Sequence, residues 1–361
     1  MQEHVLIAGA TGLVGFAAMK HFATRGYKVT AVSRRKPFET FGARHVALDL
    51  TDRAACADTL SAMTDVTRVV YAALYEKPGL VAGWLEADQI ETNRRMLENF
   101  FDPLEKVTPR LRHVSLLQGT KAYGAHVRPL AVPARENRSE LKEQPNFYWD
   151  QESYIRTKQQ GRDWHWTIFR PQIVFGFSLG AAMNLIPAIG VYAALLKEEG
   201  RPLCYPGGSS SVLEAVDADL LADAIAWAGV RDRQENAIFN ITNGDVFVWK
   251  NVWSAIADAL GMKPGPDAAM SLGAEMPRRA ADWDAVKRKY DLVAPDMNAF
   301  VGESFHYADF TMAYGAAREV PAAIVSTIAL RKAGFHDVID TEEMFRKWFR
   351  LFQEKRLLPP C

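Results

Sequence analysis

The first fifteen residues constrain this chain more than any other segment. They contain the run HVLIAGATGLVG, in which the apolar residues Val5–Ala8 are followed at once by the turn Gly9–Gly15. This pattern predicts a buried parallel strand, a tight turn and the start of a helix. Glycines at the first, fourth and seventh turn positions let the backbone bend sharply and approach a diphosphate closely. The unpaired N–H groups of the helix start attract phosphate, so the segment predicts a dinucleotide-binding loop.

The spacing of these glycines also carries information. Gly9, Gly12 and Gly15 follow the pattern Gly-x-x-Gly-x-x-Gly rather than the Gly-x-Gly-x-x-Gly of common dehydrogenases. The pattern resembles the loop of short-chain dehydrogenase/reductase (SDR) proteins, particularly the extended ones.

Strand and helix signals alternate through the first half of the chain. Alternation of this kind predicts a doubly wound α/β domain with a parallel sheet and right-handed crossovers. The predicted strands cover 4–8, 27–34, 45–52, 68–74, 111–119, 166–176 and, later, 237–244. The predicted helices cover 13–25, 53–63, 85–102, 183–200 and 218–230.

The pattern changes after Gly176, because the remaining chain is mostly helical and rich in aromatic residues. We therefore predict an NADP-binding Rossmann domain over 1–176, with a returning segment at about 212–244. Residues 177–211 and 245–361 are predicted to form a smaller, mostly helical substrate-binding region. In open α/β sheets ligands lie at the carboxyl ends of the strands, so this region should cover that edge.

Composition excludes several classes of function. Basic and acidic residues both number 43 in a chain of 361, so nothing favours nucleic acid or an anionic membrane surface. No apolar run approaches the roughly 18 residues of a membrane-spanning helix. The eight histidines show no metal-ligand spacing, and no metal is expected. The three cysteines have no pairing or zinc pattern and are typical of reduced thiols in a cytoplasmic protein.

The end of the second predicted strand bears on the choice of coenzyme. It reads Ser33-Arg34-Arg35-Lys36, where an NAD-selective protein usually has Asp or Glu for the adenosine ribose. Guanidinium groups pair with phosphate and stack on adenine, so this segment favours NADPH over NADH. The alternative is a solvated basic strand end. The residues predicted to bind the coenzyme are Gly9, Thr11, Gly12, Leu13, Val14, Ser33, Arg34, Arg35, Asp49, Leu50, Leu74, Tyr148, Ile173 and Ser178.

Two tyrosines compete for the catalytic role. SDR chemistry places a Tyr hydroxyl beside the substrate oxygen, and a nearby Lys lowers the pKa of that Tyr. Tyr154 and Lys158 have the usual Tyr-x-x-x-Lys spacing, but Tyr154 lies closer to Arg170 than the catalytic tyrosine of ordinary SDR proteins does. Tyr148 lies further ahead of Arg170 and has no Lys four residues on. Lys121, just after the fifth predicted strand, can reach the same space from another direction.

Both regions resemble one known family. LLQGTKAYG (116–124) resembles the Leu-Gln-x-Gly-x-Lys-x-Tyr stretch of the progesterone 5β-reductase/iridoid synthase-like (PRISE) family, and NFYWDQE (146–152) resembles its Asn-Phe-Tyr-Tyr-x-x-Glu-Asp motif. The resemblance covers nearly the whole chain and is most specific between about 113 and 255. Two residues depart from the motif: Trp149 replaces the second Tyr, and Ser153 replaces the family Asp.

The resemblance implies NADPH-dependent reduction of the C=C bond of an apolar α,β-unsaturated carbonyl compound, an enone or enal. In the family the first Tyr of the motif is catalytic. Tyr148 is thereby expected to donate a hydrogen bond to the enolate oxygen, with Lys121 in support. The resemblance also implies that Trp149, Phe305 and Tyr307 line a hydrophobic substrate pocket.

Two alternatives to this function stay open at this point, and the oligomeric state is a separate question. A conventional extended SDR enzyme would use Tyr154 and Lys158 to reduce a ketone or aldehyde, or to epimerise or dehydrate a nucleotide sugar. A non-catalytic NADPH sensor would bind partners through its C-terminal region. Extended SDR proteins often form dimers through the helices expected here at about 85–102 and near Tyr148, and a homodimer through these helices is a further hypothesis.

Overall fold

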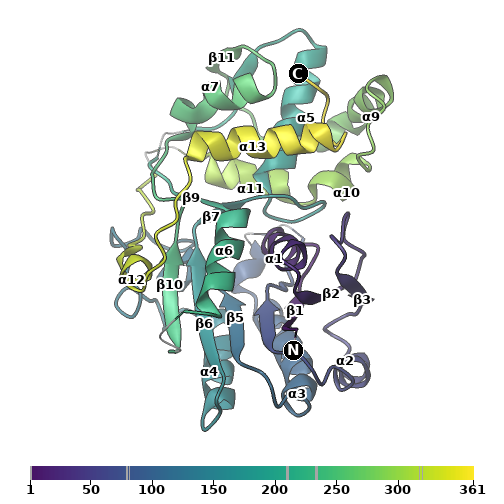
Figure 1. Ribbon diagram of the computed structural model, residues 1–361. Helices are drawn as coiled ribbons and strands as arrows, with labels where there is room; N and C mark the ends of the chain where they lie inside the picture. Colours follow the sequence, from purple (N-terminus) through teal and green to yellow (C-terminus); the bar gives the residue numbers. More distant parts are fainter. Residues whose placement is uncertain are drawn as a thin grey trace.

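The computed structural model describes residues 2–78, 80, 82–208, 211–231, 235–316, 318 and 320–361. A seven-stranded sheet occupies the lower half of the molecule in Figure 1. Its strands run in the order β10-β6-β5-β4-β1-β2-β3, and every neighbouring pair is parallel. They are β1 (His4–Ala8), β2 (Lys28–Ser33), β3 (Arg44–Ala47), β4 (Arg68–Tyr71), β5 (His113–Leu117), β6 (His165–Pro171) and β10 (Ala237–Ile241).

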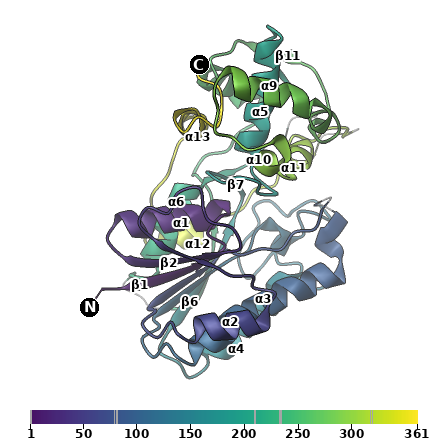
Figure 2. The same cartoon turned by 90° about the vertical axis from the view of Figure 1, so that its right-hand side faces the viewer.

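Helices cover both faces of this sheet, as Figure 2 shows. One face carries α1 (Leu13–Thr24), α6 (Ala218–Ala228) and α12 (Ile328–Lys332), and the other carries α2 (Arg53–Leu60), α3 (Ala87–Glu105) and α4 (Phe147–Gln159). A sheet covered on both faces needs apolar strands throughout. β1 meets that need, because all five of its residues are buried. The predicted doubly wound parallel sheet is confirmed.

The strand order reverses direction between β1 and β4. The chain adds β2 and β3 on one side of β1 and then returns to place β4, β5 and β6 on the other side. The loops at the carboxyl ends of β1 and β4 therefore separate, and the crevice between them is where ligands bind in sheets of this kind.

A smaller, mostly helical region lies above the carboxyl ends of the strands in Figure 1. It contains α5 (Leu185–Glu198), α7 (Trp249–Ala259), α8 (Leu272–Glu275), α9 (Ala280–Lys289), α10 (Met297–Val301), α11 (Ser304–Thr311) and α13 (Thr341–Glu354), with the parallel pair β8 (Leu203–Tyr205) and β11 (Pro264–Asp267). α5 is apolar all round and buried over its first twelve residues, so it forms the centre of this region. Short 3₁₀ turns complete the chain: η1 (Ala82–Leu85), η2 (Thr120–Tyr123) and η3 (Pro277–Arg279).

One predicted strand is wrong in its extent. Residues 166–176 form two strands, because β6 ends at Pro171 and β7 (Ile173–Phe175) pairs with β9 (Ala215–Asp217) in a separate two-stranded sheet. Pro171 has no N–H to continue the ladder. Gln172 donates its backbone N–H to Ile241 at 3.4 Å, and the chain then leaves the main sheet.

The third predicted strand is also shorter than expected. β3 ends at Ala47, because the Asp49 carboxylate accepts hydrogen bonds from the backbone N–H and the hydroxyl of Thr51 and so forms a turn. Asp52 then caps α2 by accepting from the Ala55 N–H at 3.0 Å.

The division into an NADP-binding domain and a substrate-binding region stays a prediction. One continuous apolar core runs from α1 and α6 on the sheet to α5, α7 and α13. The two regions are therefore packed against each other through side chains such as Phe175, Phe345 and Trp348 rather than separated by a linker.

Candidate active site

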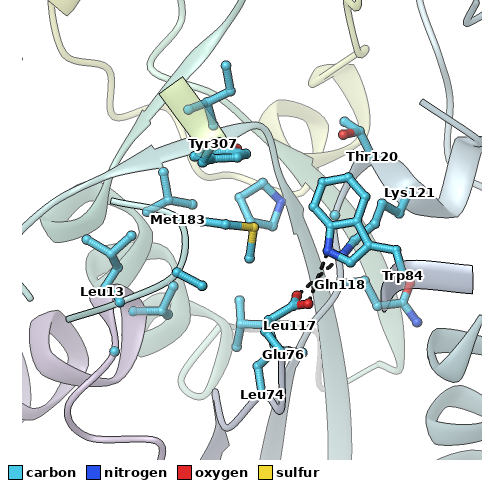
Figure 3. Close-up of a pocket in the computed structure, with 18 of the residues that line it drawn as sticks. Leu13, Leu74, Glu76, Trp84, Leu117, Gln118, Thr120, Lys121, Met183 and Tyr307 are labelled. Atoms are coloured by element: carbon cyan, nitrogen blue, oxygen red, sulfur yellow. Dashed lines mark hydrogen bonds and ion pairs between the residues drawn. The ribbon is translucent and has the colours of Figure 1, made fainter. Parts of the chain in front are cut away.

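A cavity of about 910 Å³ lies between the sheet and the helical region. Its walls come from the segments that follow β1, β2, β3, β4, β5 and β6, and from the loop before α5 and the end of α11 (Figure 3). The volume lies in the upper part of the range seen for ligand pockets, roughly 300–1,000 Å³. Of the residues predicted to bind coenzyme, those that line this cavity are Gly9, Thr11, Gly12, Leu13, Val14, Ser33, Arg34, Arg35, Asp49, Leu50, Leu74, Tyr148 and Ile173.

The glycine turn after β1 leaves room for a ligand where side chains would fill the space. Gly9 has φ +84°, and a Cβ there would lie 2.6 Å from the backbone of Ala72. A Cβ on Gly15 would lie 2.2 Å from the Gly9 carbonyl oxygen. Gly12 is the N-cap of α1 and supplies no side-chain cap. The first N–H groups of α1 are therefore free to bind an anion, and the turn fits a dinucleotide diphosphate.

The segment after β2 brings two guanidinium groups to the same cavity. The Ser33 hydroxyl donates a hydrogen bond to the Arg35 carbonyl oxygen at 2.7 Å, which shapes the strand end. Arg34 and Arg35 both line the cavity. Across from them, the Thr51 N–H lowers the pKa of the Asp49 carboxyl, with a smaller effect of the Arg34 charge. This arrangement fits the adenosine end of a dinucleotide.

Tyr148 lies in the first turn of α4, and two neighbours determine its position. The Asn146 side chain caps the helix by accepting from the Tyr148 N–H at 3.1 Å. The Gln118 side chain donates to the Tyr148 carbonyl oxygen at 3.2 Å. The phenol lies over Gly119, where an added Cβ would be 3.3 Å from the hydroxyl oxygen. A glycine at this position therefore keeps the Tyr148 hydroxyl uncrowded.

The environment of Tyr148 favours its neutral form. Burial raises the pKa of the phenol, and the nearby Glu76 carboxylate raises it further. Tyr148 thus holds its proton at neutral pH and can act as a hydrogen-bond donor inside the cavity.

Lys121 reaches the same cavity from η2. Its ammonium group lies 3.6 Å from Glu76 Oε1 and 4.1 Å from the centre of the Trp84 ring. Burial lowers the pKa of Lys121, and the Glu76 charge opposes that shift. Figure 3 shows Lys121 and Trp84 across the cavity from Leu13, which belongs to the glycine turn. The structure thus brings Tyr148 and Lys121 to one cavity, with Lys121 paired to Glu76.

The second tyrosine and lysine lie elsewhere. Tyr154 donates a hydrogen bond to Asp102 at 2.7 Å, and the Lys158 ammonium lies 2.7 Å from the same carboxylate. These contacts join α4 to α3, and neither residue lines the cavity. Burial and the Asp102 carboxylate raise the pKa of Tyr154, opposite to the lowered value that SDR chemistry uses.

Three of the predicted site residues do not reach the cavity. Ser178 is buried and accepts a hydrogen bond from Asn184, the N-cap of α5, at 3.1 Å. Trp149 packs against the cluster of Ala122 and Phe147, and its indole donates to the Gln144 carbonyl oxygen at 3.0 Å. Phe305 packs in the core under α11, while Tyr307 on the same helix lines the cavity. In each case the direction of the side chain on its element decides the outcome, and the local sequence does not reveal it.

Several residues of the cavity wall were not predicted from the sequence, among them three that carry polar groups. Glu76, Trp84 and His126 come from loops after β4 and β5 and have no motif around them. Only their position just beyond the carboxyl ends of two central strands could have drawn attention to them.

Metal-binding clusters and membrane-spanning helices are both absent from the described parts of the chain. No group of three or more His, Cys, Asp or Glu side chains there could hold a metal ion. No helix among the described residues is long and apolar enough to cross a membrane.

The parallel sheet, the glycine turn and the cavity at the switch in strand order define an extended SDR-type Rossmann protein. Within that class the chain belongs to the PRISE family: the family model described as "PRISE-like Rossmann-fold domain" matches residues 54–359. The resemblance found in the sequence is confirmed.

Relatives and structural neighbours agree with this assignment. The "(S)-8-oxocitronellyl enol synthase" of Catharanthus roseus is 31% identical over 331 residues, covering 84% of this chain and 80% of that protein. The "3-oxo-Delta(4,5)-steroid 5-beta-reductase" of Arabidopsis thaliana is 34% identical over 279 residues, covering 72% and 69%. The solved UDP-glucose 4-epimerase from Bifidobacterium longum, in complex with NAD+ and UDP, superposes with a TM-score of 0.68 at 15% identity and covers 98% of both chains. That last likeness shows the shared fold alone.

Proposed function

We propose that this protein is an NADPH-dependent reductase of the C=C bond of α,β-unsaturated carbonyl compounds. One observation carries the proposal: Tyr148, and not Tyr154, presents its phenol to the cavity that the glycine turn also lines. The relatives add support, because one is named as a steroid 5-beta-reductase and another as an enol synthase.

NADPH, held by the glycine turn, Arg34 and Arg35, would supply the hydride that adds to the β-carbon of the substrate. Reduction at that carbon moves negative charge to the carbonyl oxygen and gives an enolate. Tyr148 donates a hydrogen bond to this oxygen, and its raised pKa keeps it neutral while it does so. A donor of this kind contributes about 3 kcal/mol of transition-state stabilisation. The Lys121 ammonium adds positive charge to the same buried space, and the α-carbon then takes a proton from water.

The preference for NADPH over NADH rests on Arg34 and Arg35. The strand end Ser33–Lys36 offers these two guanidinium groups and no carboxylate, and both arginines line the cavity. A guanidinium pairs with a phosphate through two parallel hydrogen bonds, whereas it gains little from a ribose hydroxyl.

The first experiment is to mix the purified protein with NADPH and 2-cyclohexen-1-one and to identify the product by mass and chromatography. Cyclohexanone would establish C=C reduction. Cyclohexenol would mean carbonyl reduction and would contradict the proposal.

We further propose that the substrate is a small, fairly apolar enone or enal, that neither nucleic acid nor a membrane is a partner, and that the protein acts in the cytoplasm. All three cysteines are free, which agrees with a reducing compartment. A homodimer through α3 and α4 is part of the same proposal. Arg95 is an exposed residue of α3, and Arg95→Glu is expected to separate the two copies. Light scattering after size exclusion tests the pairing, and a monomeric mass for the wild-type protein would contradict it.

A further inference from the structure

Four side chains form a cluster at the end of the cavity away from the glycine turn. Glu76 and Trp84 come from the loop between β4 and α3, while Lys121 and His126 follow β5, and all four line the cavity. Trp84 is their common neighbour: Lys121 lies over its ring, and the His126 ring centre is 6.1 Å away in a perpendicular arrangement. In Figure 3 Trp84 and Lys121 lie opposite Leu13, with Glu76 directed toward the space between them.

Only one of the two oxygens of the Glu76 carboxylate accepts hydrogen bonds from described side chains. Its side chain is 7% exposed. Oε2 accepts hydrogen bonds from Trp84 Nε1 at 3.1 Å and from Gln89 Nε2 at 2.8 Å. Oε1 is buried and accepts no hydrogen bond among the described residues, since the Lys121 ammonium lies 3.6 Å away. Beyond its ion pair with Lys121, this oxygen faces the cavity and can accept a hydrogen bond from water or from a group of the substrate.

The ring nitrogens of His126 are a second set of polar atoms at this end of the cavity. Both of its ring nitrogens are buried, and neither has a hydrogen-bond partner in the described part of the chain. Burial, aided by the Lys121 charge, lowers the pKa of His126 to about 4. The ring is therefore neutral at neutral pH and offers one N–H donor and one nitrogen acceptor.

The charges of the cluster restrict what can satisfy these atoms. Glu76 disfavours an anionic group, and Lys121 disfavours a cationic one. Glu76 Oε1 can accept a hydrogen bond, while the Lys121 ammonium and the N–H of the neutral His126 ring can each donate one. A neutral group that both donates and accepts fits this part of the cavity, and a hydroxyl is the smallest such group that a substrate can carry in place of water.

We propose that Glu76, Lys121 and His126 form a subsite for a hydroxyl group of the substrate, so that the preferred substrates are hydroxylated enones or enals. This inference rests on the proposed function, because it assigns the substrate class of the same cavity. A site built to hydrogen-bond a hydroxyl discriminates strongly against the analogue without it, because its buried polar groups are then left unpaired.

The test compares 2-cyclohexen-1-one with its 4-, 5- and 6-hydroxy derivatives, using NADPH and the ratio of kcat/KM values. We expect the wild-type protein to prefer at least one hydroxylated isomer by about tenfold or more. Glu76→Gln keeps the shape and the bonds to Trp84 and Gln89 but replaces the free acceptor with an amide donor, and His126→Phe keeps the ring and removes both nitrogens. Each variant should bring the preference close to one. Glu86→Gln, an exposed position paired with Lys77 and outside the cavity, is the matched control and should keep the wild-type preference.

Each outcome bears on the inference. Equal wild-type rates for the parent and every hydroxylated isomer would overturn it, and so would a preference that survives both variants. A weaker NADPH affinity in both variants, with an unchanged preference, would assign the cluster to the coenzyme and also overturn it. If no enone is reduced at all, the proposed function fails separately. Calorimetric binding of the same compounds then decides the inference: a hydroxyl-dependent affinity that Glu76→Gln removes supports the subsite, and its absence overturns it.

Discussion

At the scale of single residues, Tyr148 and Tyr154 differ in what their hydroxyl groups contact. They lie two turns apart on α4. The Tyr148 phenol lies over Gly119 at the cavity, whereas the Tyr154 hydroxyl donates to Asp102 on α3. The same Tyr→Phe change therefore removes a group in the cavity at one position and an interhelical hydrogen bond at the other.

We expect Tyr148→Phe to lower kcat for 2-cyclohexen-1-one by roughly 100- to 1,000-fold, the usual loss for one oxyanion donor. Tyr154→Phe should retain near wild-type kcat and lose about 1 kcal/mol of unfolding free energy, the typical worth of one hydrogen bond. Steady-state kinetics and urea unfolding measure the two effects. If Tyr154→Phe alone abolishes turnover, the conventional SDR mechanism is correct.

A second residue-scale prediction concerns the coenzyme. Arg34→Ala combined with Arg35→Ala should raise the KM for NADPH by roughly 10- to 100-fold, because charge-assisted hydrogen bonds to a phosphate are lost. The KM for NADH should change much less, since NADH carries no such phosphate. Parallel kinetics with both coenzymes check this, and an equal rise for NADH would argue against a 2′-phosphate site at these arginines.

At the scale of elements, the N-terminal cap of α4 contacts the backbone of Tyr148, so the same residue that begins the helix also positions a residue of the cavity. Asn146 caps α4 at Tyr148, and Asp340 caps α13 in the same way by accepting from the Glu343 N–H at 2.9 Å. α13 packs against α5 and α7, and none of its residues lines the cavity.

This pair of caps makes a matched comparison. Asn146→Ala and Asp340→Ala should each cost about 1 kcal/mol of unfolding free energy, because both remove an N-cap acceptor. Only Asn146→Ala should also lower kcat, about tenfold or more, because it frees the turn that orients Tyr148. Denaturant unfolding and steady-state kinetics on both variants test this. A similar kcat for the two variants would show that the cap does not orient the tyrosine.

At the scale of the whole molecule, Glu214 joins three distant segments beside the cavity. Its carboxylate accepts hydrogen bonds from the Val325 N–H at 2.8 Å and from the Gln172 side chain at 3.2 Å. Gln172 also donates to the Ala323 carbonyl oxygen, and Gln172 and Ala323 both line the cavity. The segment around Ala323 is thus attached to the corner between β6 and β7 through one buried acid.

Burial raises the pKa of Glu214 to about 7 from its usual 4.5, against the opposing effect of its two hydrogen bonds. The folded protein therefore holds this proton more tightly than the unfolded chain does. The contribution of Glu214 to the unfolding free energy is therefore fully present below about pH 4.5. It is lost as the pH rises through 7, and the total loss is roughly 3 kcal/mol.

Glu214→Gln should remove that loss, because the amide oxygen still accepts both hydrogen bonds and carries no charge. We expect the unfolding free energy of the variant, relative to the wild-type protein, to increase between pH 5 and pH 8. Urea unfolding across this range measures the difference. Parallel pH profiles for the two proteins would show that Glu214 titrates normally.

Much of this fold could be predicted from local sequence. The alternation of apolar strands and helices gave the doubly wound sheet, since periodicity is set by which faces of each element are buried. The prediction of a single strand over 166–176 is wrong. The strand ends at Pro171, which has no N–H, and the next residues pair with a different strand in a second sheet. Tyr148 and Lys121 were found as candidates because they lie just beyond strand ends and in recognisable motifs.

The sequence by itself determined the elements, the glycine turn and the family, because these depend on short-range patterns of apolar, turn and motif residues. Only the tertiary structure decided which side chains meet. It directed Ser178, Trp149 and Phe305 away from the cavity and brought Glu76 and His126 into it. The physical reason is that a side chain's neighbours come from segments far apart in the chain. Their packing is a property of the whole molecule, and no local pattern records it.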